Sequence, residues 1–286
     1  DRDARWRDGY RRENRSGDEK GIDLDRYAWL HKRQSLRQPA QLVTPSRWLA
    51  DQVRASELMQ DWPCAVIPNP VPTDVFRPYS KAFARGVLGL PTDEPLVAFG
   101  AIGGTRDPRK GWDLLEAALP LVHRDVPDAQ AVIFGESEPP KPPRLGLPLH
   151  FAGRLHDDMS LSLLYSAVDV MVVPSRQENL PQTATEAQAC GTPVVVFGTT
   201  GTRETVVDGT TGHVVDQLDP RDLAAALTSV LTDADWSRRA GDLARARAAA
   251  EWAPDVVASR YTELAAEILE RRQASSRGVA HRSLTG

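Results

Sequence analysis

The stretch VMVVPSRQENLPQTATEAQACGTPVVVF, residues 170–197, decides the fold that we expect for this chain. Residues 170–173 and 193–197 are apolar runs, and residues 181–190 between them have the pattern of a helix. Continuous apolar strands joined by a helix are typical of a parallel sheet that is covered on both faces. The stretch therefore predicts an α/β fold.

The same alternation continues on both sides of this stretch. Runs rich in Val, Ile and Phe predict further strands at residues 96–99, 131–134, 150–152 and 212–215. Helical patterns lie near residues 111–124, 158–167 and 202–207, and later helices begin at the capping residue Asp219 and near Trp236. We therefore predict a Rossmann-like, doubly wound domain over residues 81–251.

The N-terminal segment has the pattern of an incomplete domain. Residues 40–43 and 65–67 predict two short strands, and Ser46 can cap a helix between them. We assign residues 1–80 to the C-terminal remnant of a Rossmann-like domain, and we expect its highly charged residues 1–20 to be solvated. Because the first methionine is Met59, we expect a fragment whose upstream part is missing.

Two segments follow the predicted doubly wound domain. An apolar stripe with helical spacing predicts a helix over residues 252–272. Residues 273–286 have no such pattern, and we expect them to be disordered.

Composition argues against several classes of function. The 286 residues include 35 Lys and Arg against 39 Asp and Glu, which gives a net charge of −4. An acidic chain without a basic block is a poor candidate for binding nucleic acid or anionic lipid. The apolar runs are far shorter than the ~20 residues of a membrane span. Two cysteines are too few for a disulfide framework and favour a reducing cytosol.

Several motifs with a known chemistry are absent from the sequence. Residues 100–104 follow a strand but lack the G-x-G-x-x-G spacing, and no G-x-x-x-x-G-K-[ST], G-x-S-x-G or H-E-x-x-H occurs. Three D-x-D triplets begin at Asp1, Asp23 and Asp233, at the terminus or at helix starts. Capping explains the latter two better than metal binding, and we predict no metal site.

Polar residues gather after the predicted strand 170–173. Glu178 lies in the following loop and Glu186 in the next helix, whose first N–H groups, at Gln182 and Thr183, suit a phosphate. Open α/β sheets bind their ligands at this carboxyl edge. Carboxylates at such a site accept hydrogen bonds from sugar hydroxyls. The equally weighted alternative is a loop acid and a solvated helix residue.

A basic segment, RDPRKG at residues 106–111, is predicted at the same edge of the sheet. Its cations, Arg109 and Lys110 above all, could neutralise a diphosphate leaving group. A solvated turn is the alternative. The loop after the third strand could meet a nucleotide base through the backbone of Arg154 and Leu155.

With these residues together, the chain resembles the GT-B family of retaining, nucleotide-sugar-dependent glycosyltransferases known as family four, from about residue 40 to 270. Glu178 and Glu186 match its E-x7-E motif. Other segments are similar to the family's motifs in the same order: VIPN at 66–69, FRP at 76–78, KG at 110–111, EAQACGTPVV at 186–195 and ETVVDGTTG at 204–212. The form QENLP at 177–181 further suggests enzymes of the colanic acid type.

This resemblance implies a role for each matched residue. Glu186 would bind the ribose of the nucleotide, and Glu178 the donor hexose or the reaction centre. Lys110 would bind the diphosphate by charge, together with the backbone amides of Gln182 and Thr183.

Two positions depart from the family's pattern. The arginine expected six residues before Lys110 is Gly104 here, so that Arg106 or Arg109 would have to substitute. The Gly-Gly pair expected before the Glu204 segment is Thr200-Gly201.

The resemblance implies metal-independent, cofactor-free transfer of a hexosyl group from a nucleoside-diphosphate sugar to a hydroxyl of a glycan or lipid-linked glycan, in polysaccharide or glycoconjugate biosynthesis. The location would be the cytoplasm or the inner face of the membrane, reached through the missing domain. The helix 252–272 would cross back onto that domain, and we expect the fragment alone to be inactive. Two alternatives stay open: a non-catalytic sugar-nucleotide-binding protein, suggested by Gly104, and a GT-B sugar-nucleotide epimerase, suggested by fold analogy alone.

Overall fold

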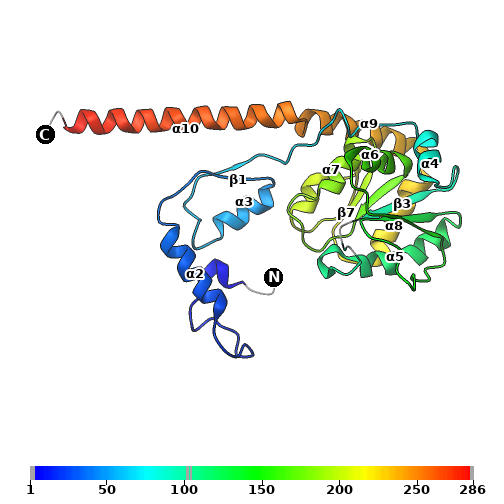
Figure 1. The fold of residues 1–286 in the computed structure, drawn as a ribbon, viewed down its shortest axis with the longest axis horizontal. Coiled ribbons are helices and arrows are strands. Elements are labelled where there is room, and N and C mark those ends of the chain that lie inside the picture. Colours follow the sequence, from blue (N-terminus) through cyan, green and yellow to red (C-terminus); the bar gives the residue numbers. More distant parts are fainter. Residues whose placement is uncertain (1–3, 101–102, 104, 284–286) are drawn as a thin grey trace. The chain divides into compact units, whose positions relative to one another are not determined.

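A computed structural model describes residues 4–100, 103 and 105–283 of the chain (Figure 1). The chain divides into two compact units: unit 1, Asp1–Ile67, and unit 2, Pro68–Gly286. Within the described residues, no helix combines the length and the apolar character that crossing a membrane requires.

Unit 1 contains a small strand-helix-strand element. β1 (Leu42–Thr44) and β2 (Cys64–Val66) pair in parallel, and α3 (Arg47–Arg54) connects them. The hydroxyl of Ser46 caps α3 by accepting a hydrogen bond from the N–H of Leu49 at 3.2 Å. The element order expected for residues 40–67 is therefore present.

Most described residues of 4–20 are exposed, as expected of a solvated segment, but Arg5 is an exception. Residues Arg5–Asp8 form a short helix, α1, and Arg5 is only 7% exposed. Its guanidinium donates to the carboxylate of Asp23 at 2.6 Å, which lowers the pKa of Asp23. Asp23 also caps α2 (Leu24–Ser35). A guanidinium can be buried when it is paired with a carboxylate. The partner of Arg5, Asp23, lies outside residues 1–20, so the charge pattern of that segment does not predict the pair.

Unit 2 is built on a parallel sheet with six strands among the described residues. In chain order they are β3 (Leu96–Gly100), β4 (Gln130–Phe134), β5 (Leu149–Gly153), β6 (Val170–Val173), β7 (Val194–Phe197) and β8 (Gly212–Val215). Their order in space is β5-β4-β3-β6-β7-β8, so the direction of winding reverses between β3 and β6. The predicted doubly wound parallel sheet is confirmed. Such a reversal opens a crevice where the two strands end.

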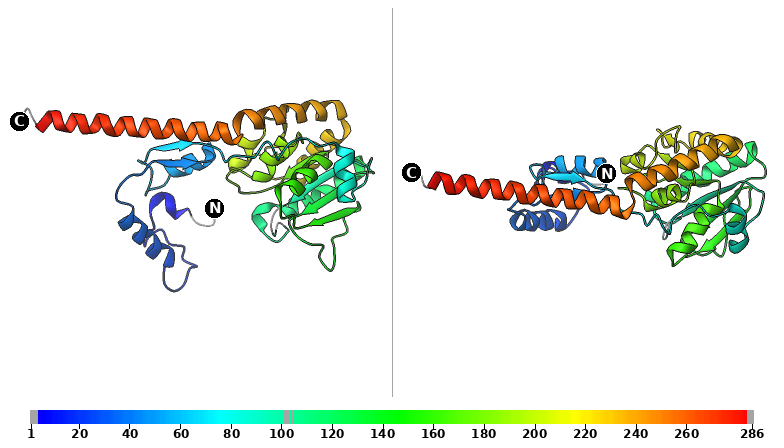
Figure 2. Two further views of the ribbon diagram at one scale, coloured as in Figure 1. Left: turned by 45° about the horizontal axis from the view of Figure 1, so that its top comes forward. Right: turned by 90° about the horizontal axis from the view of Figure 1, so that it is seen from above.

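Helices cover both faces of this sheet (Figures 1 and 2). One face carries α5 (Trp112–Asp125) and α8 (Pro220–Thr232), whose side chains belong to one buried cluster. The opposite face carries α4 (Lys81–Leu88), α6 (Asp158–Ala167), α7 (Gln182–Ala189) and α9 (Ala234–Glu251), which contribute to a second cluster.

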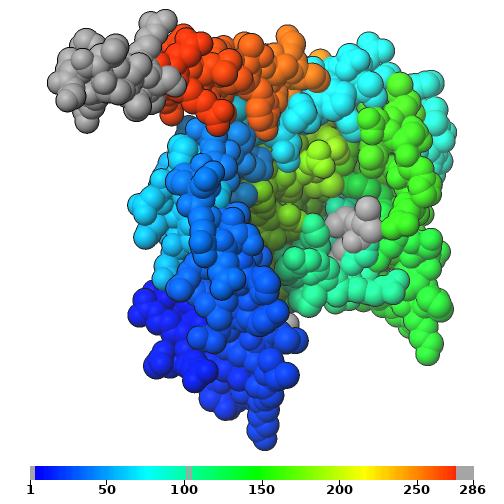
Figure 3. Space-filling model, turned by 60° about the vertical axis from the view of Figure 1, so that its left-hand side comes forward, coloured from blue at the N-terminus to red at the C-terminus, as the bar shows by residue number. Residues whose placement is uncertain are grey.

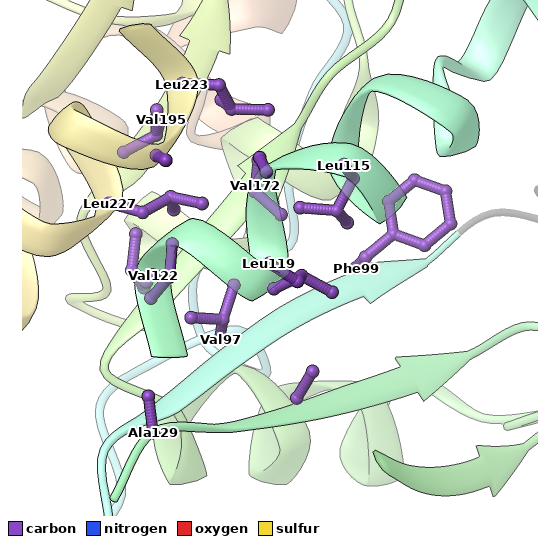
Figure 4. Packing of buried hydrophobic residues seen from close by; sticks show 14 of the residues in the cluster. Val97, Phe99, Leu115, Leu119, Val122, Ala129, Val172, Val195, Leu223 and Leu227 are labelled. Carbon is purple, nitrogen blue, oxygen red and sulfur yellow. The ribbon is translucent and has the colours of Figure 1, made fainter. Parts of the chain in front are cut away.

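Successive side chains of a strand belong alternately to the two clusters. Val97, Phe99 and Val172 point toward α5 and α8 and pack on Leu115, Leu119 and Leu227 (Figure 4). Their neighbours, such as Ala98, Met171 and Val173, belong to the cluster on the opposite face. Side chains alternate across a strand, so burial of both sets explains why the strands are continuously apolar.

Residues 68–80 pack in unit 2, although the sequence pattern groups them with the first domain. Val71 and Phe76 are buried, and the N–H of Val71 donates to the carbonyl of Trp252 at 2.8 Å. The guanidinium of Arg245 in α9 donates to the carbonyls of Thr73 and Phe76 at 2.9 and 2.8 Å. These partners lie more than 160 residues away, so the local proline-rich pattern does not reveal them.

Two helices differ from the sequence prediction. The helix expected near residues 202–207 is a short 3-10 helix, η2 (Thr200–Thr205), in which β-branched threonines disfavour a regular α-helix. The last helix, α10 (Pro254–Ser283), continues through residues that we expected to be disordered. Residues 273–283 contain no proline and a single glycine, Gly278, so nothing in the segment ends the helix.

Gly111 brings two loops of unit 2 into contact. It follows the 3-10 helix η1 (Pro108–Lys110) and has φ +71°, a left-handed conformation that favours glycine. A Cβ atom at this position would lie 1.9 Å from the carbonyl oxygen of Pro174, which follows β6. The segment after β3 therefore lies directly against the segment after β6.

Arg176 ties the same two segments together. Its guanidinium donates to the carboxylate of Asp113 through two hydrogen bonds of 2.6 Å and to the carbonyl of Pro108 at 2.9 Å. Its backbone N–H donates to the carbonyl of Arg109 at 2.7 Å. The Arg176 guanidinium lowers the pKa of Asp113. The contact that Gly111 permits is therefore reinforced by charge.

Replacing Leu119 tests the core beneath α5. Leu119 is fully buried, so Leu119→Ala should lower the free energy of unfolding by about 2–5 kcal/mol through lost burial and a cavity. Leu243 in α9 is 50% exposed, and Leu243→Ala should change it by less than about 0.5 kcal/mol. Urea denaturation of both variants measures the difference. Equal effects would contradict the packing described here.

Replacing Gly111 tests the contact between the two segments. Gly111→Ala combines a strained φ with a clash on backbone, and should lower the free energy of unfolding by about 3 kcal/mol or more. Gly89 has a similar φ of +64° but open space around its Cβ position, so Gly89→Ala should lower it by only about 1–2 kcal/mol. Thermal and urea unfolding of the two variants give the comparison. A Gly111→Ala protein no less stable than Gly89→Ala would disprove the close approach.

Candidate functional site

Two adjoining cavities lie at the carboxyl edge of the sheet in unit 2. The first, the Glu178 cavity, has a volume of about 410 Å³ and is lined by residues that include Gly100, Lys110, Val173 and Glu178. The second, the Glu186 cavity, has a volume of about 590 Å³ and is lined by Phe134, Gly135, Arg154, Leu155, His156, Leu161, Tyr165 and Glu186. Gln182 and Thr183 line both cavities. The first cavity lies where β3 and β6 end, at the reversal of strand order.

The N-terminus of α7 separates the two cavities. Pro181 precedes the helix and has no side chain that could cap it. The first hydrogen bond of the helix is from the N–H of Ala184 to the carbonyl of Pro181 at 3.1 Å. The N–H groups of Gln182 and Thr183 precede it and lie at the positive end of the helix dipole. This arrangement suits an anion that spans both cavities.

Lys110 and Glu178 form an ion pair in the Glu178 cavity. Their side chains come from the segments after β3 and β6, which lie beside one another on the surface of unit 2 (Figure 3). They are 28% and 20% exposed, so a ligand can reach both charges. The pairing places a cation and a hydrogen-bond acceptor within one small pocket, as expected for a charged, hydroxyl-bearing ligand.

Glu186 lies in the second cavity and is held by Tyr165. The Tyr165 hydroxyl donates to Oε2 of Glu186 at 2.9 Å. Burial raises the pKa of Glu186, and the hydrogen bond from Tyr165 opposes that shift. Burial and the neighbouring Glu186 carboxylate raise the pKa of Tyr165 well above its usual value, so the phenol stays a donor. One carboxylate oxygen of Glu186 is thus fixed by Tyr165, which orients the group in the cavity.

Arg154 and Leu155 line the Glu186 cavity, together with Phe134. The structure therefore brings seven of the proposed site residues to one edge of the sheet. They are Lys110, Glu178, Gln182, Thr183, Glu186, Arg154 and Leu155, with Tyr165 added by the structure.

Arg106 and Arg109 do not line these two cavities. The guanidinium of Arg109 donates to the carboxylate of Asp107 at 2.7 and 3.1 Å, and this pair lowers the pKa of Asp107 to about 2. Arg106 is exposed. Gly104 lies outside the described residues. Spacing alone placed both arginines near the diphosphate site, but a local aspartate engages one of them and the other faces solvent.

The D-x-D triplets of the described chain act as helix caps. Asp23 accepts from the N–H of Arg26 at 2.9 Å, and Asp233 accepts from the N–H of Trp236 at 2.8 Å. Asp1 and Asp3 lie outside the described residues. Within the part of the chain that the structure describes, no three His, Cys, Asp or Glu side chains gather as metal ligands.

Two residues at this edge of the sheet, Arg176 and Tyr165, escape the sequence analysis. Arg176 and Tyr165 bind partners that lie far away in the sequence, so their spacing carries no signal. A tyrosine on the inner face of a predicted helix is a usable clue, because a buried hydroxyl needs a partner. The sequence marks Thr200 only as a departure from a Gly-Gly pair, whereas in the structure its side chain donates to the backbone carbonyl of Glu178.

Comparison with known proteins gives one family and several relatives. Residues 96–233 match the family described as "Glycosyl transferases group 1". The D-inositol 3-phosphate glycosyltransferase of Segniliparus rotundus is 35% identical over 219 residues, which are 70% of this chain and 48% of that protein. That of Thermobispora bispora is 35% identical over 220 residues, 71% of this chain and 50% of that protein. The chain spans about half the length of these curated relatives.

Solved structures share the fold. Sucrose-phosphate synthase from Thermosynechococcus elongatus superposes with a TM-score of 0.73 and 28% identity, over 90% of this chain and 65% of that one. Anabaena HepE, solved in complex with UDP and glucose, gives a TM-score of 0.69 and 18% identity, over 86% of this chain and 68% of that one.

These findings confirm the predicted fold class and change one expectation. The relatives above are named D-inositol 3-phosphate glycosyltransferases, not enzymes of the colanic acid type that QENLP at 177–181 suggested. That short segment is too local to identify a subfamily. Residues 96–233 match the glycosyl transferases group 1 family, and the chain has the parallel α/β fold of GT-B glycosyltransferases.

Proposed function

We propose that this chain binds the donor of a retaining glycosyltransferase, which moves a hexosyl group from a nucleoside-diphosphate sugar to an acceptor hydroxyl. The observation that carries the proposal is the pair of cavities that share the N-terminus of α7. A nucleotide sugar has an anionic centre with a nucleoside on one side and a sugar on the other. The two cavities offer an anion site with a carboxylate on each side.

Each part of the donor has a matching group in this arrangement. The diphosphate would accept hydrogen bonds from the N–H groups of Gln182 and Thr183 and pair with Lys110. The nucleoside would occupy the Glu186 cavity, with its ribose hydroxyls donating to Glu186 and its base against the backbone of Arg154 and Leu155. The hexose would then occupy the Glu178 cavity.

The chemistry needs stabilisation of the leaving diphosphate. The bond between the anomeric carbon and the diphosphate oxygen breaks, and the electron pair stays on the diphosphate. Lys110 and the N-terminus of α7, which line the same cavity, would stabilise that charge. The acceptor hydroxyl oxygen then bonds to the anomeric carbon on the face from which the diphosphate leaves, its proton passes to the departing diphosphate oxygen, and the configuration is retained. In this proposal the charge stabilisation comes from these groups and needs no metal ion.

In this proposal, the ion pair of Lys110 and Glu178 belongs to the donor-free state of the site. A bound diphosphate would compete with the Glu178 carboxylate for the Lys110 ammonium. Release from this pair would leave Glu178 able to accept hydrogen bonds from sugar hydroxyls. Donor binding and orientation of Glu178 would thus be coupled.

The comparisons support the donor half of this proposal. The related proteins are named as glycosyltransferases, and HepE has been solved with UDP and glucose. The acceptor, a glycan or lipid-linked glycan, and the placement in polysaccharide or glycoconjugate biosynthesis rest on the sequence resemblance.

Titration calorimetry with UDP, GDP and ADP tests donor binding. At least one nucleotide should bind the folded chain, and Glu186→Ala should weaken that binding at least tenfold, because it removes a hydrogen bond from a charged acceptor, worth about 1.5–3 kcal/mol. Glu263→Ala, on the exposed surface of α10, is the matched control and should bind as the parent does. If none of the three nucleotides binds the folded protein, the proposal fails.

The raised pKa of Glu186 predicts opposite effects on stability and binding. The folded state holds the Glu186 proton more tightly than the unfolded state, so the ionised group opposes folding at pH values above its raised pKa. Glu186→Gln keeps an acceptor for Tyr165 and removes the charge. It should raise Tm at pH 7.5, and the gain should shrink as pH falls through the raised pKa toward the ordinary value of 4.5.

The same substitution should weaken nucleotide binding severalfold at pH 7.5, because an amide is a weaker acceptor than a carboxylate. Scanning calorimetry without nucleotide and titration with it, both at two pH values, measure the two effects. A Glu186→Gln protein that loses both stability and binding at pH 7.5 would show that Glu186 has only a structural role.

A further inference from the structure

Thr200 has a backbone conformation that its side chain disfavours. Among the described residues it alone combines a positive φ, 51°, with a side chain larger than that of glycine. β-Branched residues rarely adopt this left-handed conformation. The sequence resemblance places a glycine at this position, and glycine would adopt the conformation without strain. The threonine must therefore bring something that offsets the strain.

The hydroxyl of Thr200 forms hydrogen bonds with both backbone groups of Glu178, its N–H and its carbonyl. Oγ1 donates to the carbonyl oxygen of Glu178 at 2.8 Å and accepts from the N–H of Glu178 at 3.0 Å. The N–H of Gly201 donates to the same carbonyl at 3.0 Å. One residue earlier, Oγ1 of Thr199 donates to the carbonyl of Ser175 at 3.0 Å. The start of η2 thus holds the loop that carries Glu178.

The other end of η2 is anchored in the core. The amide of Gln188, a fully buried residue of α7, donates to the carbonyl of Thr205 at 2.6 Å. The guanidinium of Arg247 in α9 donates to the carbonyls of Thr205 and Glu204 at 2.7 and 2.8 Å. Because η2 is fixed at both ends, it can hold Thr200 in a strained conformation and transmit its position to Glu178.

We propose that Thr200 is a positioning residue for Glu178, and that it acts on recognition of the sugar part of the donor and not on the nucleoside diphosphate. This inference rests on the proposed function, since it takes the Glu178 cavity as the hexose site. The hydrogen bonds observed for the hydroxyl go to Glu178 and Thr202, and neither residue lines the Glu186 cavity. Loss of the hydroxyl therefore affects one end of the donor.

Two substitutions separate the hydroxyl from the backbone conformation. Thr200→Gly keeps the left-handed backbone and removes both hydrogen bonds to Glu178. Thr200→Ser keeps the hydroxyl and removes only the methyl group. Thr210→Gly, at an exposed position in the turn after Val207, is the matched control. Far-ultraviolet circular dichroism and Tm establish that each variant is folded.

The experiment titrates each protein with UDP and with UDP-glucose, or with the corresponding GDP or ADP pair if that nucleotide binds more tightly. Thr200→Gly should raise the Kd of the nucleotide sugar about threefold to tenfold, the loss expected for one or two neutral hydrogen bonds. The Kd of the nucleoside diphosphate should stay within about twofold of the parent value. Thr200→Ser and Thr210→Gly should match the parent with both ligands.

Three outcomes would overturn the positioning role. Thr200→Gly could bind the nucleotide sugar as the parent does, or it could lose both ligands equally, which would indicate a general structural role. Thr200→Ser could fail to preserve sugar binding, which would exclude the hydroxyl as the cause. In each of these cases the parent still binds nucleotide, so the proposed function stands. If the parent binds neither ligand, the proposed function fails and this inference fails with it.

Discussion

The reversal of strand order between β3 and β6 is the constraint on which the rest of unit 2 depends. The chain leaves β3 toward β4 and β5, and it leaves β6 toward β7 and β8. The segments that follow β3 and β6 therefore start side by side but lead to opposite faces of the sheet. Neither segment covers the end of the other strand, and the Glu178 cavity lies in the resulting crevice.

This crevice brings opposite charges together because the two loops touch at their backbones. Gly111 lets the segment after β3 approach the carbonyl of Pro174, and Arg176 binds that segment through Asp113 and two carbonyls. Lys110 precedes Gly111 directly, so its ammonium reaches Glu178. The pair is a consequence of backbone packing, and moving either loop would separate the charges.

Two groups at this edge are held in states that oppose folding. Glu186 is a largely buried carboxylate whose pKa is raised by that burial, and Thr200 has a strained backbone. Each is surrounded by partners that fix it, Tyr165 for Glu186 and the anchored 3-10 helix η2 for Thr200. Such groups persist where the rest of the domain supplies enough stability, and they cluster at sites that bind ligands.

The sequence by itself determined the parallel sheet of unit 2, because strands buried on both faces must be continuously apolar, as residues 170–173 and 194–197 are. It also placed Glu178, Glu186 and Lys110 at one edge, because those positions follow from element order alone. Tertiary structure decided the rest: that Arg109 turns to Asp107, that Tyr165 orients Glu186, that residues 68–80 pack in unit 2 and that Thr200 holds Glu178. Except for the Arg109 pair, these contacts join residues far apart in the chain, and periodicity reports only which face of its own element a residue occupies.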